Sequence, residues 1–354
     1  MAEARGSNRG EAWQRFAVAM SLGGIGGATF AYLQLPLPWM LGAMLFSTAG
    51  ALGGLRLAVP LWLRQMLITV LGVMLGSAFT PELLDQIAGW SSGFALLLGY
   101  IPITTALCFL YFRKVAKFDP VTAYFSAAPG GFNEMVLAGE AMGGNVRSIA
   151  LVHSMRILLV VFTIPVYFRY LAPHAAPPVS AAARGLGLDI SPRDAGVLLA
   201  CAVLGWPLAR MIRLPAAQLV GPMLISAAAH LTGLTASKPP IILVALAQVV
   251  LGAAIGARFS GLKLGAVAHV MRVAIWSVPI MLGVTACFTW LATHFVSMSP
   301  DAVTLSLSPG GLTEMSLVAL SLGIETAFVS AMHIARIGLV VTLAPLAFRL
   351  MRGR

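Results

Sequence analysis

Long apolar stretches with few or no charged side chains recur along this chain and dictate its environment. Five of them cover residues 17–33, 91–112, 195–209, 240–257 and 273–292. A helix of about 20 such residues can cross a hydrocarbon core about 30 Å thick. Charged residues make up only 10% of the 354 residues, whereas a soluble domain carries about 25%. The sequence therefore predicts a polytopic integral membrane protein with an all-α fold.

The charged residues that remain are mostly basic and give a formal net charge of +11. They lie mainly in short loops between the apolar stretches, as in the cytoplasmic loops of membrane proteins. No interleaving of basic and aromatic residues indicates a nucleic-acid surface. Cys108, Cys201 and Cys287 lie inside apolar stretches without paired spacing, so we expect neither disulfides nor a zinc site.

One segment near the middle of the chain recurs near its end. Pro-Gly-Gly-Phe-Asn-Glu-Met at 129–135 returns as Pro-Gly-Gly-Leu-Thr-Glu-Met at 309–315, an offset of 180 residues. Between 129–169 and 309–349, 16 of 41 aligned positions are identical without a gap. Such self-similarity indicates a duplicated chain. The expected division is a first membrane repeat at 1–175, a linker at 176–191 and a second membrane repeat at 192–354.

Each predicted half holds five apolar spans and one interrupted segment that contains the Pro-Gly-Gly break. The spans are 15–33, 37–55, 61–80, 91–113 and 146–168, then 195–211, 217–235, 240–258, 270–293 and 326–348, with the interrupted segments at 120–143 and 302–323. If each interrupted segment crosses the membrane, the halves have the same orientation. If it re-enters and leaves on one side, they are inverted.

The positive-inside rule favours inverted halves with a cytoplasmic N-terminus. That arrangement places Arg210, Arg213, Arg258 and Lys263 in the cytoplasm, whereas parallel halves would place them outside. The expected fold is therefore two tandem inverted repeats of about five transmembrane helices each, plus one broken or re-entrant Pro-Gly-Gly helix per repeat.

The break itself follows from local chemistry. Proline removes a backbone donor and glycine tolerates φ > 0, so a helix cannot run cleanly through 129–131 or 309–311. About ten residues on either side, at about 1.5 Å each, place the break near the middle of the bilayer. Non-helical backbone at that depth lies inside protein or lines a watery cavity. Discontinuous helices in inverted halves are the usual plan of secondary-transporter sites.

An acidic residue follows each break. The half-helices begin near Gly131 and Gly311, and their free N–H groups carry positive dipole charge that can hold an anion. Glu134 and Glu314 lie three residues further on. One interpretation is that each carboxylate caps its own helix end. The other is a proton or cation site or a gate, because a carboxylate inside a membrane is costly.

A basic residue inside a span follows in each half. Arg156 and Arg336 lie about ten residues into their predicted spans. His153 and His333 precede them by three residues and so share a helix face with them. One interpretation pairs each arginine with a glutamate of the same or the opposite half, and the other has the arginines bind an anionic substrate. Two Glu and two His could also form a metal site, although no HEXXH-type spacing supports one.

The candidate substrate- or ion-binding residues all lie at the breaks and on the spans behind them. They are Gly130, Gly131, Asn133, Glu134, His153, Arg156, Gly310, Gly311, Thr313, Glu314, His333 and Arg336. We assign no catalytic or metal-binding residue and expect no cofactor.

The duplicated Pro-Gly-Gly-x-x-Glu-Met break, each followed by His-x-x-Arg at 153–156 and 333–336, resembles the bacterial AbrB-type membrane protein family. That family is labelled a regulator of aidB expression or an ammonia monooxygenase. The resemblance covers nearly the whole chain. It implies a location in the bacterial inner (cell) membrane and kinship with cation–proton antiporters and anion transporters. It implies no particular substrate, and we see no compact His cluster that would build a monooxygenase centre.

Together these features favour a secondary transporter, not an enzyme, for a small anionic or zwitterionic solute. The chain contains no GxxxxGK[ST] motif that would bind ATP. An ion gradient or the solute itself is therefore expected to provide the energy for transport. The expected partners are the solute, a coupling ion (H⁺ or Na⁺) and the lipid bilayer, with no nucleic acid. Self-association into a homo-oligomer stays open. The alternatives are a membrane sensor or regulator with a transporter-like fold and, less favoured, a membrane metalloenzyme.

Overall fold

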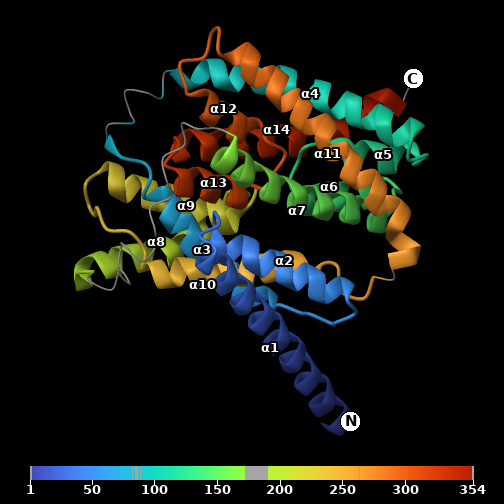
Figure 1. Ribbon diagram of the computed structural model, residues 1–354. Coiled ribbons are helices and arrows are strands. Elements are labelled where there is room, and N and C mark those ends of the chain that lie inside the picture. The colour runs from blue at the N-terminus through green and yellow to red at the C-terminus, as the bar shows by residue number, and fades with distance from the viewer. Residues whose placement is uncertain are drawn as a thin grey trace. The chain divides into compact units, whose positions relative to one another are not determined.

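The computed structural model describes residues 2–352 except 82, 84–86, 88, 172–189 and 263. The regular structure of these residues consists of fourteen α-helices, and no strand occurs among them (Figure 1). The chain divides into two compact units. The first unit comprises Met1–Pro81 and Arg169–Leu264, and the second comprises Glu82–Phe168 and Gly265–Arg354.

The first unit contains six helices, three from each end of the sequence. They are α1 (Ala2–Tyr32), α2 (Pro38–Leu52), α3 (Leu61–Gly76), α8 (Pro192–Met211), α9 (Ala217–Leu231) and α10 (Ile241–Ala257). The residue before α2 is Leu37 at φ 44°, and the residue before α9 is Ala216 at φ 50°. Prolines at the starts of α2 and α8 fit the first helical turn, where a backbone N–H has no partner to lose.

Glycines allow the helices of this unit to approach to backbone contact. A Cβ added to Gly26 of α1 would lie 2.7 Å from the carbonyl carbon of Gly42 in α2. A Cβ added to Gly205 of α8 would lie at the same distance from the carbonyl carbon of Gly221 in α9. Both crossings therefore depend on the absence of side chains, and the two crossings involve corresponding positions of the two sequence halves.

The second unit contains eight helices. They are α4 (Trp90–Lys114), α5 (Pro120–Ala127), α6 (Phe132–Ala141), α7 (Val146–Tyr170), α11 (Leu264–Ala292), α12 (Pro300–Leu307), α13 (Leu312–Leu322) and α14 (Thr326–Arg352). The short helices α5 and α12 both begin with proline behind a capping side chain. Asp119 accepts a hydrogen bond from the Thr122 N–H at 2.9 Å, and Ser299 accepts one from the Ala302 N–H at 3.2 Å.

The long helices α4 and α11 of the second unit lie side by side and run in opposite directions (Figure 1). Tyr100 and Thr285 form a hydroxyl–hydroxyl hydrogen bond of 3.2 Å at one end of the contact. Towards the other end, the Tyr111 hydroxyl donates to the Val273 carbonyl at 3.1 Å. As residue numbers rise along α4, those of its contacts fall along α11, so the pair is antiparallel.

The predicted spans and the helices agree in place, but not all agree in length. Five helices are long and apolar enough to cross a membrane by length and composition: α4, α7, α8, residues 268–292 of α11, and α14. These helices indicate a multi-pass membrane protein. The spans predicted at 37–55, 61–80, 217–235 and 240–258 form apolar helices of 15, 16, 15 and 17 residues. At about 1.5 Å per residue they measure about 22–26 Å, less than a full hydrocarbon core.

The compact units cut across the predicted halves of the sequence. Each half contributes three helices to the first unit and four to the second. The predicted halves 1–175 and 192–354 describe a duplication in the sequence, and that division stays a prediction. Of the predicted linker at 176–191, only residues 190 and 191 belong to the described part of the chain.

Candidate functional site

Both Pro-Gly-Gly segments lie in the second unit and interrupt its helices at corresponding positions. The first interruption separates the end of α5 at Ala127 from the start of α6 at Phe132. The second separates the end of α12 at Leu307 from the start of α13 at Leu312. In both cases four residues of non-helical backbone connect two short helices, as the proline in each segment predicts.

The glycines of the break are needed for space and not for an unusual backbone angle. Gly131 has φ −65° and ψ 143°, and Gly311 has φ −76° and ψ 154°. Every residue type adopts such extended angles. The chain therefore passes the break in an extended conformation, and the tolerance of glycine for φ > 0 is not used there.

The first glycine of each pair makes room for the methionine of the motif. A Cβ added to Gly130 would lie 3.0 Å from the Sδ atom of Met135, and one added to Gly310 would lie 2.8 Å from that of Met315. Both methionine side chains are buried. The methionine thus folds back over the break and packs the half-helix against the residues that precede it.

The second glycine makes room for the glutamate. A Cβ added to Gly131 or Gly311 would overlap a carboxylate oxygen of Glu134 or Glu314 respectively. Each half-buried carboxylate therefore lies over the residue that precedes its own half-helix, where the positive end of the helix dipole favours a negative charge. In the described residues neither carboxylate accepts a hydrogen bond, so the capping interpretation stays a prediction, and the carboxylates lie close to the break.

The two arginines bind the helix ends on the other side of the breaks. Arg156 donates to the Ala128 and Gly130 carbonyls at 3.2 and 3.3 Å. Arg336 donates to the Leu307, Ser308 and Gly310 carbonyls at 3.2, 2.7 and 2.9 Å. The last carbonyls of a helix have no intrahelical partners and carry negative dipole charge. Each guanidinium therefore caps the half-helix that ends at the break.

The Glu–Arg ion pairs of the first interpretation are not formed in the described residues. Within the described part of the chain, the one salt bridge joins Arg15 to Glu11. Arg156 and Arg336 are each 2% exposed, and their Nε atoms have no hydrogen-bond partner in the described residues. The carbonyls released by the break take the place of the carboxylates, because they lie directly beside the guanidinium groups while the glutamates fold over the opposite helix ends.

The histidines occupy the same helix face as the arginines but bind differently. The His153 Nε2 atom donates to the Phe125 carbonyl at 2.8 Å, near the end of α5. The His333 Nδ1 atom donates to the Val329 carbonyl of its own helix at 3.0 Å. The Nε2 atom of His333 is buried and has no hydrogen-bond partner in the described residues. In those residues no three His, Cys, Asp or Glu side chains gather as a metal site requires, so a metal site gains no support.

A buried face of α4 connects the surroundings of the two arginines. Tyr100, Thr104 and Cys108 follow one another at a spacing of four residues, and all three are fully buried. Tyr100 lies in the neighbourhood of Arg336, and Cys108 lies in that of Arg156. The two guanidinium groups also lie in one neighbourhood. Both arginines and this face of α4 therefore belong to one site.

Two buried hydroxyls at corresponding positions lie in the helices that end at the breaks. The Oγ atoms of Ser126 in α5 and Ser306 in α12 have no hydrogen-bond partner within the described residues. Buried hydroxyls are normally bonded, so each of these two can bond a water or a polar ligand. The sequence analysis missed Ser126 and Ser306, although they match at the same offset of 180 residues as the break.

The remaining predicted residues lie at the start of the half-helices. Asn133 in α6 is exposed, whereas Thr313 in α13 is half-buried. No hydrogen bond or ion pair of either side chain joins it to the arginines in the described residues. The twelve predicted residues thus form two corresponding groups, one at each break, with the glutamates and the arginines at opposite helix ends.

Comparison with known proteins identifies the family of the chain. Residues 39–352 match the family described as Transition state regulatory protein AbrB. YhjN of Bacillus subtilis (strain 168) is 26% identical over 358 residues, which cover 94% of this chain and 92% of YhjN. A protein of Escherichia coli (strain K12) named as a regulator, AbrB, is 24% identical over 319 residues, which cover 89% of this chain and 90% of that protein. The resemblance drawn from the duplicated motif is confirmed, and the chain belongs to the AbrB family.

Proposed function

We propose that this protein is a secondary transporter of a small anionic or zwitterionic solute, coupled to H⁺ or Na⁺. Its binding site lies between the two broken helices, near the middle of the bilayer. The observation that carries the proposal is that two buried arginines, Arg156 and Arg336, face helix-end carbonyls and no carboxylate. An anionic solute would supply the negative charge that the protein itself does not place there.

The electrostatics of the second unit support an anion in this site. A buried cation without a counter-charge is costly, and this site holds two of them. Hydrogen bonds to carbonyls offset part of that cost. The Nε–H group of each arginine has no acceptor in the described residues and can donate to a bound anion. The hydroxyls of Ser126 and Ser306 add further groups that can bond a carboxylate or a similar anion.

The glutamates give the site a means of coupling to a cation. Glu134 and Glu314 place half-buried carboxylates over the N-terminal ends of α6 and α13. Neutralising a carboxylate with a proton or Na⁺ would remove a negative charge beside the site and free the helix end for an anion. The solute and the coupling ion would then favour each other's binding, as a coupled transporter requires.

Inverted repeats account for the direction of the helices in the second unit. Residues 90–114 of α4 correspond at the offset of 180 to residues 270–294, most of which form α11. These corresponding helices pack antiparallel. A pseudo-twofold axis in the membrane plane makes corresponding helices antiparallel, whereas an axis along the membrane normal would make them parallel. With the N-terminus in the cytoplasm, α5–α6 and α12–α13 would be re-entrant segments that approach each other from opposite faces of an inner membrane.

A binding screen with matched variants tests the anion site. Purified protein would be heated with a panel of mono- and dicarboxylates and amino acids, because a bound ligand raises the melting temperature. We expect at least one anion to stabilise the wild type, and the double variant Arg156→Gln/Arg336→Gln to lose this response. Arg210→Gln/Arg213→Gln in the first unit serves as the control of equal charge. Equal stabilisation of the wild type and the site variant, or no response to any anion, would contradict the proposal.

The alternative function is that of a membrane sensor or regulator with a transporter-like fold. The Escherichia coli relative carries the name of a regulator. A sensor would bind the same class of anion but move none of it across a membrane. Flux measurements in liposomes therefore separate the two functions where binding measurements do not.

A further inference from the structure

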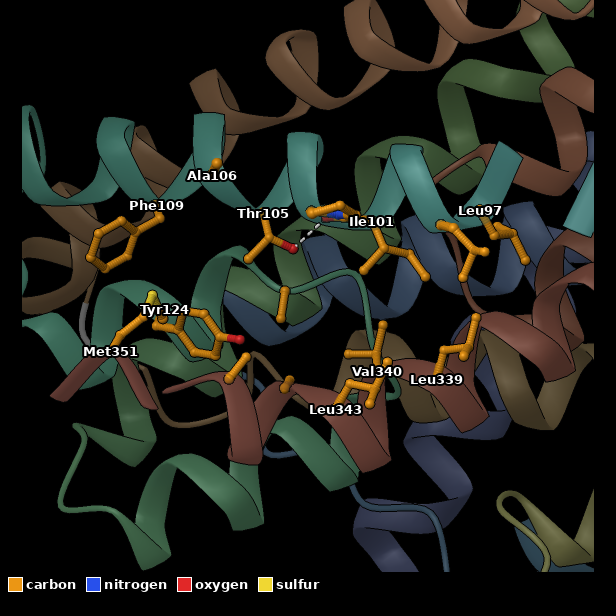
Figure 2. A pocket seen from close by; sticks show the side chains of 15 residues that line it. Leu97, Ile101, Thr105, Ala106, Phe109, Tyr124, Leu339, Val340, Leu343 and Met351 are labelled. Atoms are coloured by element: carbon orange, nitrogen blue, oxygen red, sulfur yellow. Dashed lines mark hydrogen bonds between the residues drawn. The ribbon is translucent and has the colours of Figure 1, made fainter. Parts of the chain in front are cut away.

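A cavity lies in the second unit, on another face of α4 than Tyr100, Thr104 and Cys108. It has a volume of about 360 Å³ and is lined by residues of α4, α5 and α14 (Figure 2). Leu97 and Leu339 lie at one end of it, and Phe109 and Met351 lie at the other. From Leu97 to Phe109 the helix rises by about 18 Å at about 1.5 Å per residue. This length is close to one leaflet, half of a hydrocarbon core of about 30 Å.

The lining of this cavity suits a hydrocarbon chain. Apart from Thr105 and Tyr124, its side chains carry no polar group. The Thr105 hydroxyl donates to the Ile101 carbonyl at 2.7 Å, so the helix itself already satisfies it. The cavity is also open at its rim, where Leu98 is 63% and Leu343 49% exposed. In a membrane protein such a rim faces lipid, and a small polar solute would find almost nothing to bond inside.

Three basic residues lie near the C-terminal ends of α4 and α14, the end of the cavity marked by Phe109 and Met351. Helices α4 and α14 run in the same direction along the cavity (Figure 2). Near the C-terminal ends of these helices, the Tyr124 ring contacts Phe109 of α4 and Phe348 of α14. Arg113 and Lys114 follow Phe109 within about one helical turn and a half, and Arg349 follows Phe348 directly. These three basic residues are exposed. The nearby Asp119 is engaged in capping α5.

We propose that this cavity binds an anionic phospholipid of the surrounding bilayer. One acyl chain fills the apolar space between α4, α5 and α14, and the phosphate headgroup lies against Arg113, Lys114 and Arg349. Lysine and arginine at the cytoplasmic ends of helices attract anionic headgroups. This lipid site depends on the membrane location of the chain and not on its transport activity. The lipid site can therefore be wrong while the transport function is right, and the transport function can be wrong while the lipid site is right.

An occupant of this cavity would rest directly on the first break. Ala128 lines the cavity, and its carbonyl accepts a hydrogen bond from Arg156 at 3.2 Å. Val340 lines the cavity as well, and its Cγ1 atom is 2.8 Å from the Cβ position of Gly130. Binding of the acyl chain would therefore stabilise the packing of the extended segment 128–131 against α14.

Photo-labelling tests this site directly. The protein would be placed in nanodiscs of phosphatidylcholine that contain a small fraction of a probe lipid. The probe is either phosphatidylglycerol or phosphatidylcholine, in both cases with a diazirine on the acyl chain. Labelled peptides would be identified by mass spectrometry. We expect labels on α4 and α14, with more from phosphatidylglycerol. The variant Ala106→Trp should fill the cavity and abolish labelling by both lipids, with Leu107→Trp on the same helix as the matched control. Ala347→Phe, on the opposite wall, repeats the test should Ala106→Trp fold poorly.

The headgroup has its own variant. Arg113→Gln/Lys114→Gln/Arg349→Gln should remove the preference for phosphatidylglycerol, lowering its labelling by at least about tenfold, since each basic residue contributes about fivefold. Arg210→Gln/Arg213→Gln should keep the preference. Labelling that survives both cavity-filling variants, or a headgroup preference that survives the triple variant, would overturn the proposal.

Discussion

Replacement of Gly311 by alanine tests the reason for the second glycine of the motif. Its backbone angles, φ −76° and ψ 154°, are open to alanine, so the substitution strains no backbone. The added Cβ would overlap the Glu314 carboxylate, which must leave the start of α13. Losing a carboxylate from a helix N-terminus costs about 0.3–2 kcal/mol, against a gain of about 0.4–1 kcal/mol from the stiffer unfolded chain.

A double-mutant cycle isolates this contact. In the Glu314→Ala background nothing remains for the new Cβ to displace, so Gly311→Ala should be neutral or slightly stabilising. We expect a coupling free energy of about 1–2 kcal/mol between positions 311 and 314, measured by reversible unfolding in mixed micelles. Gly131→Ala with Glu134→Ala should behave alike, because a Cβ at Gly131 also overlaps the carboxylate.

Gly338→Ala in α14 is the matched control, since a Cβ there meets nothing within 4 Å. It should have the same small effect in both backgrounds. Additive effects of Gly311→Ala and Glu314→Ala, within about 0.3 kcal/mol, would refute the explanation that the glycine makes room for the carboxylate.

Three further predictions concern other parts of the molecule. Arg336→Met should destabilise the protein more than Arg156→Met, by about 0.6–1.7 kcal/mol in the same unfolding assay. The reason is that Arg336 donates hydrogen bonds to three carbonyls and Arg156 to two. Equal losses of unfolding free energy in the two variants would contradict this explanation. Gly26→Ala should cost about 1–3 kcal/mol because α1 and α2 touch there, whereas Gly24→Ala, with nothing within 4 Å, should be harmless. In a variant without native cysteines, Lys114→Cys and Arg213→Cys should both react with an impermeant thiol reagent from the cytoplasmic side, and labelling of Arg213→Cys from outside would contradict inverted halves.

The break could be predicted from the sequence because its cause is local. A proline removes a backbone donor wherever it stands, so the ends of α5 and α12 follow from Pro129 and Pro309. The role of the glycines could not be predicted in the same way. It depends on where the Met and Glu side chains lie in three dimensions, and sequence spacing alone does not give that.

The partners of the arginines show a different limit. Pairing by charge suggested the glutamates, but a broken helix also releases carbonyls, and those of Ala128 and Ser308 lie nearer to the guanidinium groups. Counting the unsatisfied carbonyls at the break would have found this solution. Tyr100, Thr104 and Cys108 offered no such signal, because they have no polar counterparts at the offset of 180 residues, where Ile280, Val284 and Phe288 stand.

The two compact units also depend on tertiary contacts that a repeat search cannot detect. The duplication predicts where corresponding helices occur in the chain, but not which of them pack together. The structure gathers both breaks and their arginines in the second unit, while α1–α3 and α8–α10 form the first. The candidate site is thus built from both sequence halves within one unit.

Ion-coupled flux in liposomes tests the central claim most directly. The purified protein would be reconstituted with a pH-sensitive dye inside, and an anion that stabilises it would be added outside, with and without a Na⁺ gradient. We predict solute-dependent movement of H⁺ or Na⁺ in the wild type, lost in Glu134→Gln/Glu314→Gln and in Arg156→Gln/Arg336→Gln, and kept in Arg210→Gln/Arg213→Gln. Binding without flux in the wild type, or undiminished flux in both site variants, would contradict a transporter that works through the two breaks.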